Sequence, residues 1–230
     1  MAAFVLVPGA WHGGWCWQRL IPLLRAAGHA AYGFTLTGLG ERAHLAAPEV
    51  GLETHVRDVL GLLEWEDLRE VVLVGHSYAG IVACAAASLA PHRTARVVIL
   101  DGFVAVDGRS LADQKGPDFV ARSRDRAARG GCGWLVPPPD NDCFGVEDAG
   151  DLAWLRARLT PHPLRSFLEP ARLGAGWNDG TFGRTFIQCR WPEEMVEEAP
   201  PRFERLELTT GHDPMITAPR EMAGALLKLA

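Results

Sequence analysis

Residues 73–80 read LVGHSYAG and lie at the centre of the sequence pattern that decides the fold. An apolar run over residues 71–74 comes directly before small residues around Ser77, and residues 81–90, IVACAAASLA, carry almost no polar side chain. A strand that turns sharply into a helix needs small residues, because larger Cβ groups clash in so tight a turn. The stretch therefore predicts a strand, a strained turn at Ser77 and a central buried helix.

Five other short apolar runs recur along the chain with helical stretches between them, at residues 4–7, 30–34, 97–100, 186–189 and 203–208. Apolar residues at helical spacing over residues 52–63 predict a helix that covers the sheet. Residues 17–27 predict another helix, which ends at Gly28. The whole pattern is typical of the α/β class and predicts a six-stranded, mostly parallel sheet with helices on both faces.

The strand rhythm stops between residues 102 and 184. With 230 residues and 48% hydrophobic content the chain can bury one sizeable core, so we expect a single domain over residues 1–230. An insertion of this length between two strands is most simply a helical cap over the carboxyl edge of the sheet. Its aromatic residues, Trp134 and Phe144 among them, are either walls of a substrate pocket or the core of the cap.

The composition excludes some classes of partner. A formal net charge of -5 offers no basic face for a phosphate backbone, so nucleic acid is not expected and a small-molecule ligand is. The apolar run at residues 2–7 is too short to span a membrane and lacks the features of a signal peptide, so we expect a cytosolic protein with no membrane partner. The sequence does not determine the oligomeric state, and a homodimer is one of the alternatives.

The five cysteines form no paired metal spacing, and most have the character of small core residues. Cys132 and Cys143 flank a proline-rich loop and could pair if the protein were exported. The histidines outside the candidate site show no ligand spacing either, so we expect no metal and no cofactor.

Ser77 is a candidate nucleophile. The pattern Gly75, His76, Ser77, Tyr78, Ala79 matches a turn that exposes the serine oxygen, with alanine where glycine is commoner. The alternative is a serine that merely occupies a tight turn. A serine hydroxyl is a weak nucleophile, so catalysis needs a base within hydrogen-bond reach and a third group that holds this base.

His212 is the candidate base. It lies in LTTGHDPM, after the last predicted strand and before the last helix. An isolated loop histidine can also serve only to bond the backbone. Two backbone N–H groups could bind an oxyanion, that of Tyr78 directly after the serine and that of Ala10 in PGAWHGGW after the first strand. In the same turn, Trp11 and His12 either line the pocket or pack.

Four segments carry a family resemblance: FVLVPGAWHGGWCW, LTGLGER, LVGHSYAG and GHDPMITAP. In this order they resemble the α/β-hydrolase group that contains plant methylesterases, hydroxynitrile lyases and bacterial carboxylesterases. The resemblance implies an α/β-hydrolase fold in which Ala10 and Ser77 meet at the topological switch point. Ser77, His212, Ala10 and Tyr78 fall on the functional positions of that group. Many relatives have histidine at the position of Pro8, but the oxyanion donor there is a backbone group, so we expect little effect.

The acid of a triad is less obvious in this chain. Many relatives carry an aspartate after the strand that corresponds to residues 186–189, whereas this chain reads CRWPEEM there. Asp101, directly after the run VVIL, and Glu193 are the two candidates. We favour Asp101, because a carboxylate at the buried end of a strand is costly without a partner. Its alternative role is to cap the turn at Gly102.

The sequence thus predicts a serine hydrolase that cleaves carboxylic esters of small, aromatic or apolar metabolites through an acyl-enzyme. Ser77 would attack, His212 would transfer the proton, Asp101 would orient His212, and Ala10 with Tyr78 would bind the oxyanion. Lyase relatives carry a lysine just after the catalytic histidine, and this chain has none before Lys228, so cyanohydrin cleavage is disfavoured. A non-hydrolytic tailoring enzyme of, for example, polyketide biosynthesis and a receptor-like ligand-binding protein remain as alternatives.

Overall fold

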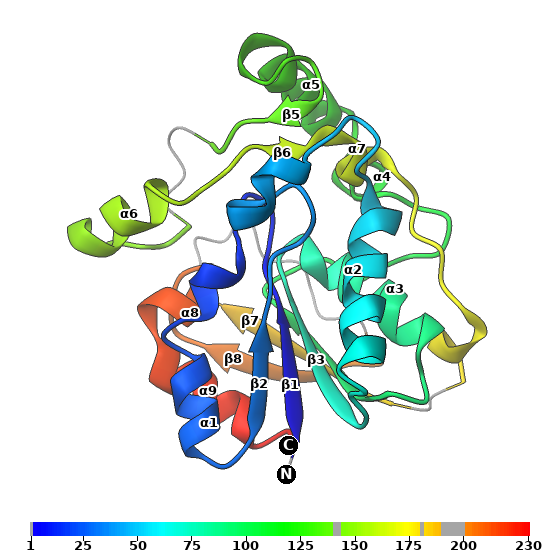
Figure 1. The fold of residues 1–230 in the computed structure, drawn as a ribbon, viewed down its shortest axis with the longest axis vertical. Helices are drawn as coiled ribbons and strands as arrows, with labels where there is room; N and C mark the ends of the chain where they lie inside the picture. Colours follow the sequence, from blue (N-terminus) through cyan, green and yellow to red (C-terminus); the bar gives the residue numbers. More distant parts are fainter. Residues whose placement is uncertain (1, 140–143, 180–181, 190–200) are drawn as a thin grey trace.

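A six-stranded parallel sheet forms the centre of the molecule (Figure 1). The computed structural model describes residues 2–139, 144–179, 182–189 and 201–230. The strands lie side by side in the order β2-β1-β3-β4-β7-β8, and every neighbouring pair runs parallel. They are β1 (Ala3–Val7), β2 (Ala30–Gly33), β3 (Val71–His76), β4 (Thr94–Leu100), β7 (Gly183–Cys189) and β8 (Glu204–Leu208). Each predicted run overlaps one of these strands, so the predicted α/β class and sheet are confirmed.

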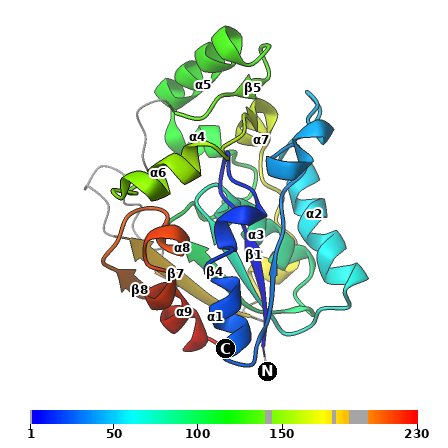
Figure 2. The same cartoon turned by 60° about the vertical axis from the view of Figure 1, so that its left-hand side comes forward.

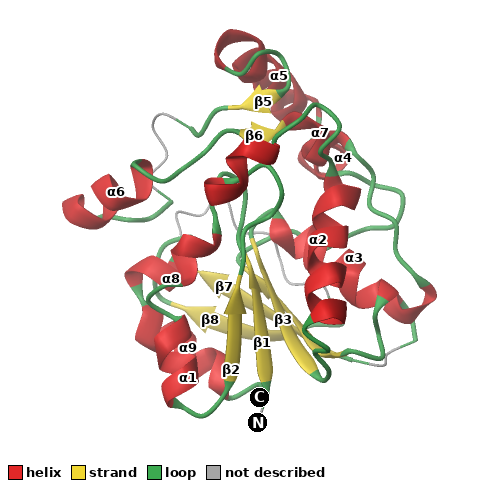
Figure 3. Ribbon diagram, viewed as in Figure 1, coloured by secondary structure: helices red, strands yellow, loops and turns green. Residues whose placement is uncertain are grey.

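Helices cover both faces of the sheet, as Figure 3 shows. On one face lie α2 (Leu52–Trp65) and α3 (Ala79–Leu89), and on the other lie α1 (Ile21–Ala26) and α9 (Pro219–Leu227). The side chains of β1 alternate between two apolar cores: Val5 packs with the α2 and α3 side, and Leu6 with the α1 and α9 side. Because both faces are covered, the central strands are apolar throughout rather than alternating.

The alanine-rich helix α3 is the buried helix that the sequence predicts. Every residue of α3 except Leu89 is buried. A Cβ atom at Gly75, the last but one residue of β3, would lie 2.3 Å from the carbonyl oxygen of Ala79. The small residues therefore allow the strand and the helix that follows it to approach closely.

The predicted helix over residues 17–27 is divided in the structure. A 3-10 turn, η1 (Gly14–Trp17), comes first, and α1 begins only at Ile21. Pro22 lies in the first turn of α1, where its missing N–H is no loss. A helix that ran from residue 17 through this proline would lose a backbone hydrogen bond, which explains the later start.

The segment between β4 and β7 lies mainly beyond the carboxyl ends of the strands (Figures 1 and 2). It contains α4 (Leu111–Lys115), α5 (Pro117–Gly130), β5 (Leu135–Val136), α6 (Ala149–Arg156), β6 (His162–Pro163), α7 (Leu164–Leu168) and η3 (Ala175–Trp177). The antiparallel pair β5 and β6 was not expected, because two-residue strands are too short to show an alternating pattern. The end of the segment returns to the sheet, where Gly174 donates its N–H to Ser88 on α3.

Two short elements complete the sheet's carboxyl edge, η2 (Gly40–Leu45) after β2 and α8 (Pro214–Thr217) after β8. Because these strands run parallel, the loops that follow β1, β3, β4 and β8 meet at this edge. In open α/β sheets this edge is where ligands bind.

We predict that the close approach of β3, β4 and α3 makes Gly102→Ala destabilising. A Cβ at Gly102 would lie 2.4 Å from the carbonyl oxygen of Ser77, so the backbone must shift, which costs about 1–3 kcal/mol of unfolding free energy. Gly224→Ala on α9 is the matched control, since a Cβ there meets nothing within 4 Å, and it should stabilise by about 0.5–1 kcal/mol. Urea denaturation of both variants measures the difference. Equal stability of the two would contradict the predicted packing.

Candidate active site

Ser77 lies in a strained turn between β3 and α3. Its φ of 53° is in the left-handed region, which a non-glycine residue adopts only where the surroundings fix it. The Ser77 N–H donates to the carbonyl of Leu100 on β4 (3.0 Å), and the Ser77 carbonyl accepts from the N–H groups of Gly80 and Phe103. These bonds tie the turn to the neighbouring strand and hold the serine at the carboxyl edge of the sheet.

Asp101 contacts His212 at the same edge. One oxygen of Asp101, Oδ2, lies 2.6 Å from His212 Nδ1, and the other, Oδ1, accepts the Cys189 N–H at 2.9 Å. The two side chains are 9% and 8% exposed, so this hydrogen bond is largely shielded from water. Asp101 therefore has both oxygens engaged, and it fixes His212 with Nδ1 toward the carboxylate and Nε2 away from it. Glu193, the other candidate acid, lies outside the described residues.

A single small cavity brings the three predicted residues together. Ser77, Asp101 and His212 line a cavity of about 40 Å³. Its other walls are Gly102, Phe103, Lys115 and Phe186. The candidate nucleophile, base and orienting acid thus line one cavity, although His212 lies 135 positions after Ser77 in the sequence.

The two predicted oxyanion donors also lie at this edge. The register of β1 and β3 pairs Val7 with Gly75, which brings the loops that carry Ala10 and Tyr78 together, as the resemblance implied. Both residues are buried, and neither of their N–H groups has a hydrogen-bond acceptor among the residues that the structure describes. Unpaired, buried N–H groups are what an oxyanion needs. The next N–H, that of Trp11, is instead bound by His162 Nδ1 at 3.3 Å.

The side chain of Tyr78 is anchored in a buried polar network. His55 Nε2 faces the carbonyl of Thr37 (3.0 Å) and therefore carries the hydrogen, so His55 Nδ1 accepts from the Tyr78 hydroxyl at 2.9 Å. Burial lowers the pKa of His55 to about 4, which keeps the ring neutral at ordinary pH. The network holds residue 78, whose N–H is a predicted oxyanion donor, by its side chain, while that N–H stays unpaired.

A second buried cluster surrounds Asp213, which the sequence analysis missed. The Asp213 carboxylate lies 3.0 Å from His12 Nε2 and 3.5 Å from His76 Nε2. His76 Nε2 also lies 2.9 Å from the carbonyl oxygen of His212, to which it donates. Asp213 follows His212 and His76 precedes Ser77 in the sequence, while His12 lies two residues after Ala10. This proximity to predicted site residues was the only signal for the cluster in the sequence.

Comparison with known proteins shows the family of this chain. Residues 4–225 match the alpha/beta hydrolase family. The chain belongs to that family. It is 36% identical over 244 residues to the carbendazim hydrolyzing esterase of Nocardioides sp. (strain SG-4G), with all of both chains covered. It is 28% identical to methylesterase 9 of Arabidopsis thaliana, covering 100% of this chain and 98% of that protein.

A solved structure shows the same fold. An extracellular alpha/beta-hydrolase from a Paenibacillus species superimposes with a TM-score of 0.84 over 99% of this chain and 98% of that chain, at 22% identity. The family and its esterase members make this alpha/beta hydrolase an enzyme that hydrolyses carboxylic esters. They do not favour the non-hydrolytic and receptor-like alternatives. No helix in the described part of the chain is long and apolar enough to cross a membrane.

None of the four predicted pocket residues of this hydrolase lines the cavity of Ser77. Phe144 stacks on His212 with the ring centroids 6.2 Å apart, and Trp11 packs on Phe144 at the same distance. His12 is 1% exposed and faces Asp213. Trp134 borders a separate hollow of about 450 Å³ beside α7. Phe103, Lys115 and Phe186 line the cavity instead, and no pattern in the sequence distinguished them.

One group of side chains in the described residues has the spacing of metal ligands. His76, His212 and Asp213 place ligand atoms within 4.8 Å of one another. However, His76 Nε2 donates to a backbone carbonyl, His212 Nδ1 faces Asp101, and Asp213 Oδ2 faces His12. Each of the three residues thus already uses one possible ligand atom in a hydrogen bond that organises the loops, so we assign no metal to this group.

The contact between Asp101 and His212 generates a prediction for catalysis. Asp101→Asn should lower kcat by about 10⁴-fold, because an amide no longer fixes the tautomer of His212. Esterase assays with an aryl acetate and circular dichroism would check activity and folding together. Asp148→Asn, which changes the cap residue of α6, is the control and should leave kcat unchanged. If Glu193→Gln caused the large loss and Asp101→Asn did not, Glu193 would be the acid.

Proposed function

We propose that this alpha/beta hydrolase is a serine carboxylesterase with Ser77 as nucleophile, His212 as base, Asp101 as the orienting acid, and the Ala10 and Tyr78 N–H groups as the oxyanion hole. The observation that carries the proposal is the 2.6 Å contact between Asp101 and His212 in the cavity that Ser77 lines. The left-handed turn at Ser77 and the unpaired N–H groups support it.

The proposed reaction has two steps. First, Ser77 Oγ attacks the ester carbonyl carbon while His212 Nε2 accepts the hydroxyl proton, and the carbonyl oxygen becomes an oxyanion between the two N–H groups. Collapse of this intermediate breaks the ester bond, and the alcohol leaves with the proton from His212. A water molecule then attacks the acyl-enzyme by the same route, which releases the carboxylic acid and restores Ser77.

The size of the cavity narrows the substrate class. At about 40 Å³ it is far smaller than the roughly 300–1,000 Å³ usual for a whole ligand, and Phe103 and Phe186 give it apolar walls. We therefore assign to it the smaller part of the ester, such as an acetyl or a methyl group, and place an aromatic part outside. The names of the relatives, a carbendazim hydrolyzing esterase and a methylesterase, are consistent with small ester groups.

The nucleophile can be tested directly. A fluorophosphonate probe should label the wild-type chain, while Ser77→Ala should show neither labelling nor turnover of an aryl acetate. Circular dichroism of Ser77→Ala controls for folding. Labelling of both proteins would refute the assignment of Ser77.

The rate of hydrolysis should depend on the length of the acyl chain of the ester. With 4-nitrophenyl esters we expect kcat/KM to fall at least about tenfold from acetate to octanoate, because the longer acyl chain meets Phe103 and Phe186. Phe103→Ala should reduce this ratio. Phe119→Ala is the matched control, since Phe119 packs on Phe167 and does not line the cavity. Equal rates for acetate and octanoate in wild type would contradict the assignment of the cavity to a small group.

A further inference from the structure

One buried contact joins the two loops that carry the proposed oxyanion donor and the proposed base. His12, two residues after Ala10, places Nδ1 2.7 Å from the carbonyl oxygen of Ala10 and Nε2 3.0 Å from Asp213 Oδ2. Asp213 follows His212 directly. The imidazole of His12 therefore bridges the loop after β1 and the loop after β8.

The partners of His12 determine its charge. The carbonyl of Ala10 can only accept a hydrogen bond, so His12 Nδ1 carries a hydrogen. An ionised Asp213 can also only accept, so His12 Nε2 carries one as well. A histidine that donates from both nitrogens is an imidazolium, and the contact is then an ion pair between side chains that are 1% and 0% exposed.

The surroundings of Asp213 fit an ionised carboxylate. Burial raises the pKa of Asp213, but His12, His76 and His212 outweigh burial and leave it below its usual value. The other titratable groups that act on it are the thiols of Cys16 on η1 and Cys189 on β7, and burial raises the pKa of both, so they stay neutral.

His76 adds a neutral link to the same cluster. Burial lowers the pKa of His76 to about 3, so this ring carries no charge at ordinary pH. Its Nε2–H donates to the carbonyl of His212 at 2.9 Å, and His76 immediately precedes Ser77. The loops of the nucleophile, the base and the first oxyanion donor are thus all connected behind the cavity.

We propose that His12 and Asp213 are positioning residues: their buried ion pair fixes the Ala10 loop against the His212 loop and keeps the charge beside His212 balanced. This inference rests on the proposed function. Neither residue lines the cavity of Ser77, so each acts through Ala10 and His212 rather than on the substrate. Two separate consequences follow, one geometric and one electrostatic.

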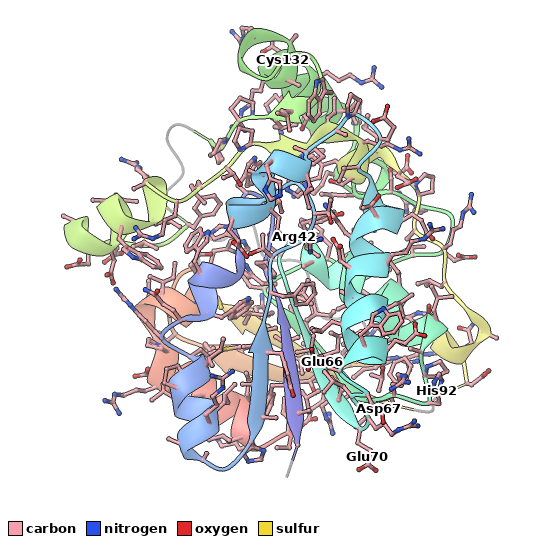
Figure 4. All side chains as sticks on the ribbon, in the orientation of Figure 1. Arg42, Glu66, Asp67, Glu70, His92 and Cys132 are labelled. Carbon is pink, nitrogen blue, oxygen red and sulfur yellow. The ribbon has the colours of Figure 1, made fainter. Side chains whose placement is uncertain are left out.

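The geometric consequence is a loss of kcat. Asp213→Asn and His12→Gln should each lower kcat for an aryl acetate by at least about tenfold with little change in KM, because a shift of an ångström at the reacting groups is costly. Asp67→Asn is the control. It weakens a different ion pair, with Arg93 at 3.1 Å, in the turn before β3 and away from the cavity (Figure 4 labels Asp67), and it should leave kcat unchanged.

The electrostatic consequence is a shift of the pH profile in opposite directions. Without the negative charge of Asp213, protonation of His212 is less favourable, so the acid limb of kcat/KM should move to lower pH in Asp213→Asn. In His12→Gln the carboxylate loses its counter-charge, so the acid limb should move to higher pH. The double variant removes both charges, and its acid limb should return toward that of wild type.

These outcomes separate positioning from general stability. A purely structural role would lower the melting temperature but leave the acid limb in place in every variant, which would overturn the proposal. If Asp213→Asn does not fold, Asp213→Glu keeps the charge and displaces it, so kcat should fall while the acid limb stays. An unchanged kcat in that variant would also overturn the proposal. Turnover by Ser77→Ala would refute the proposed function itself, whereas an inactive Ser77→Ala with fully active Asp213→Asn and His12→Gln would refute only this inference.

Discussion

The left-handed backbone of Ser77 is the constraint on which the rest of the structure depends. A serine adopts this conformation only because β4 accepts its N–H, and because Gly75 and Gly102 allow the helix and the next strand to come within contact distance. The requirement for small residues around one hydroxyl is therefore a packing requirement. Once it is met, the serine lies at the edge where the loops after β1, β4 and β8 converge, and the other groups need only short loops to reach it.

Two aspartates hold the loop of His212 through different contacts. Asp101, at the end of β4, binds the imidazole itself and is held in turn by the Cys189 N–H. Asp213, inside the loop, turns away from the cavity to His12. Each carboxylate is shielded from water, and a shielded charge without a partner is costly, so leaving its histidine would be unfavourable for either carboxylate. The loop is thus fixed both at the side chain of His212 and behind its backbone.

Much of this arrangement could be predicted from the sequence, and the reason differs from residue to residue. The strands and α3 follow from apolar runs and small residues, which are local signals. Ser77 and His212 follow from their positions after β3 and β8. Asp213 and Phe103 could not be found in this way, because their roles arise from contacts between segments far apart in sequence. The division of the predicted 17–27 helix came from Pro22, a local signal that outweighed the apolar pattern.

The cavity shows how chemistry and selectivity are separated in this fold. Its proposed reactive groups, Ser77, Asp101 and His212, lie in the turns and loops that follow β3, β4 and β8, where hydrogen bonds to neighbouring elements leave them little freedom. Phe103 and Lys115, which also line the cavity, belong to the segment between β4 and β7. Substitutions in that segment can change the size and charge of the cavity without altering the hydrogen bonds of the sheet edge. The preference for a short acyl or alcohol part, which we assign to the cavity, thus depends on this segment. The proposed cleavage of the ester depends instead on the residues at the edge of the sheet.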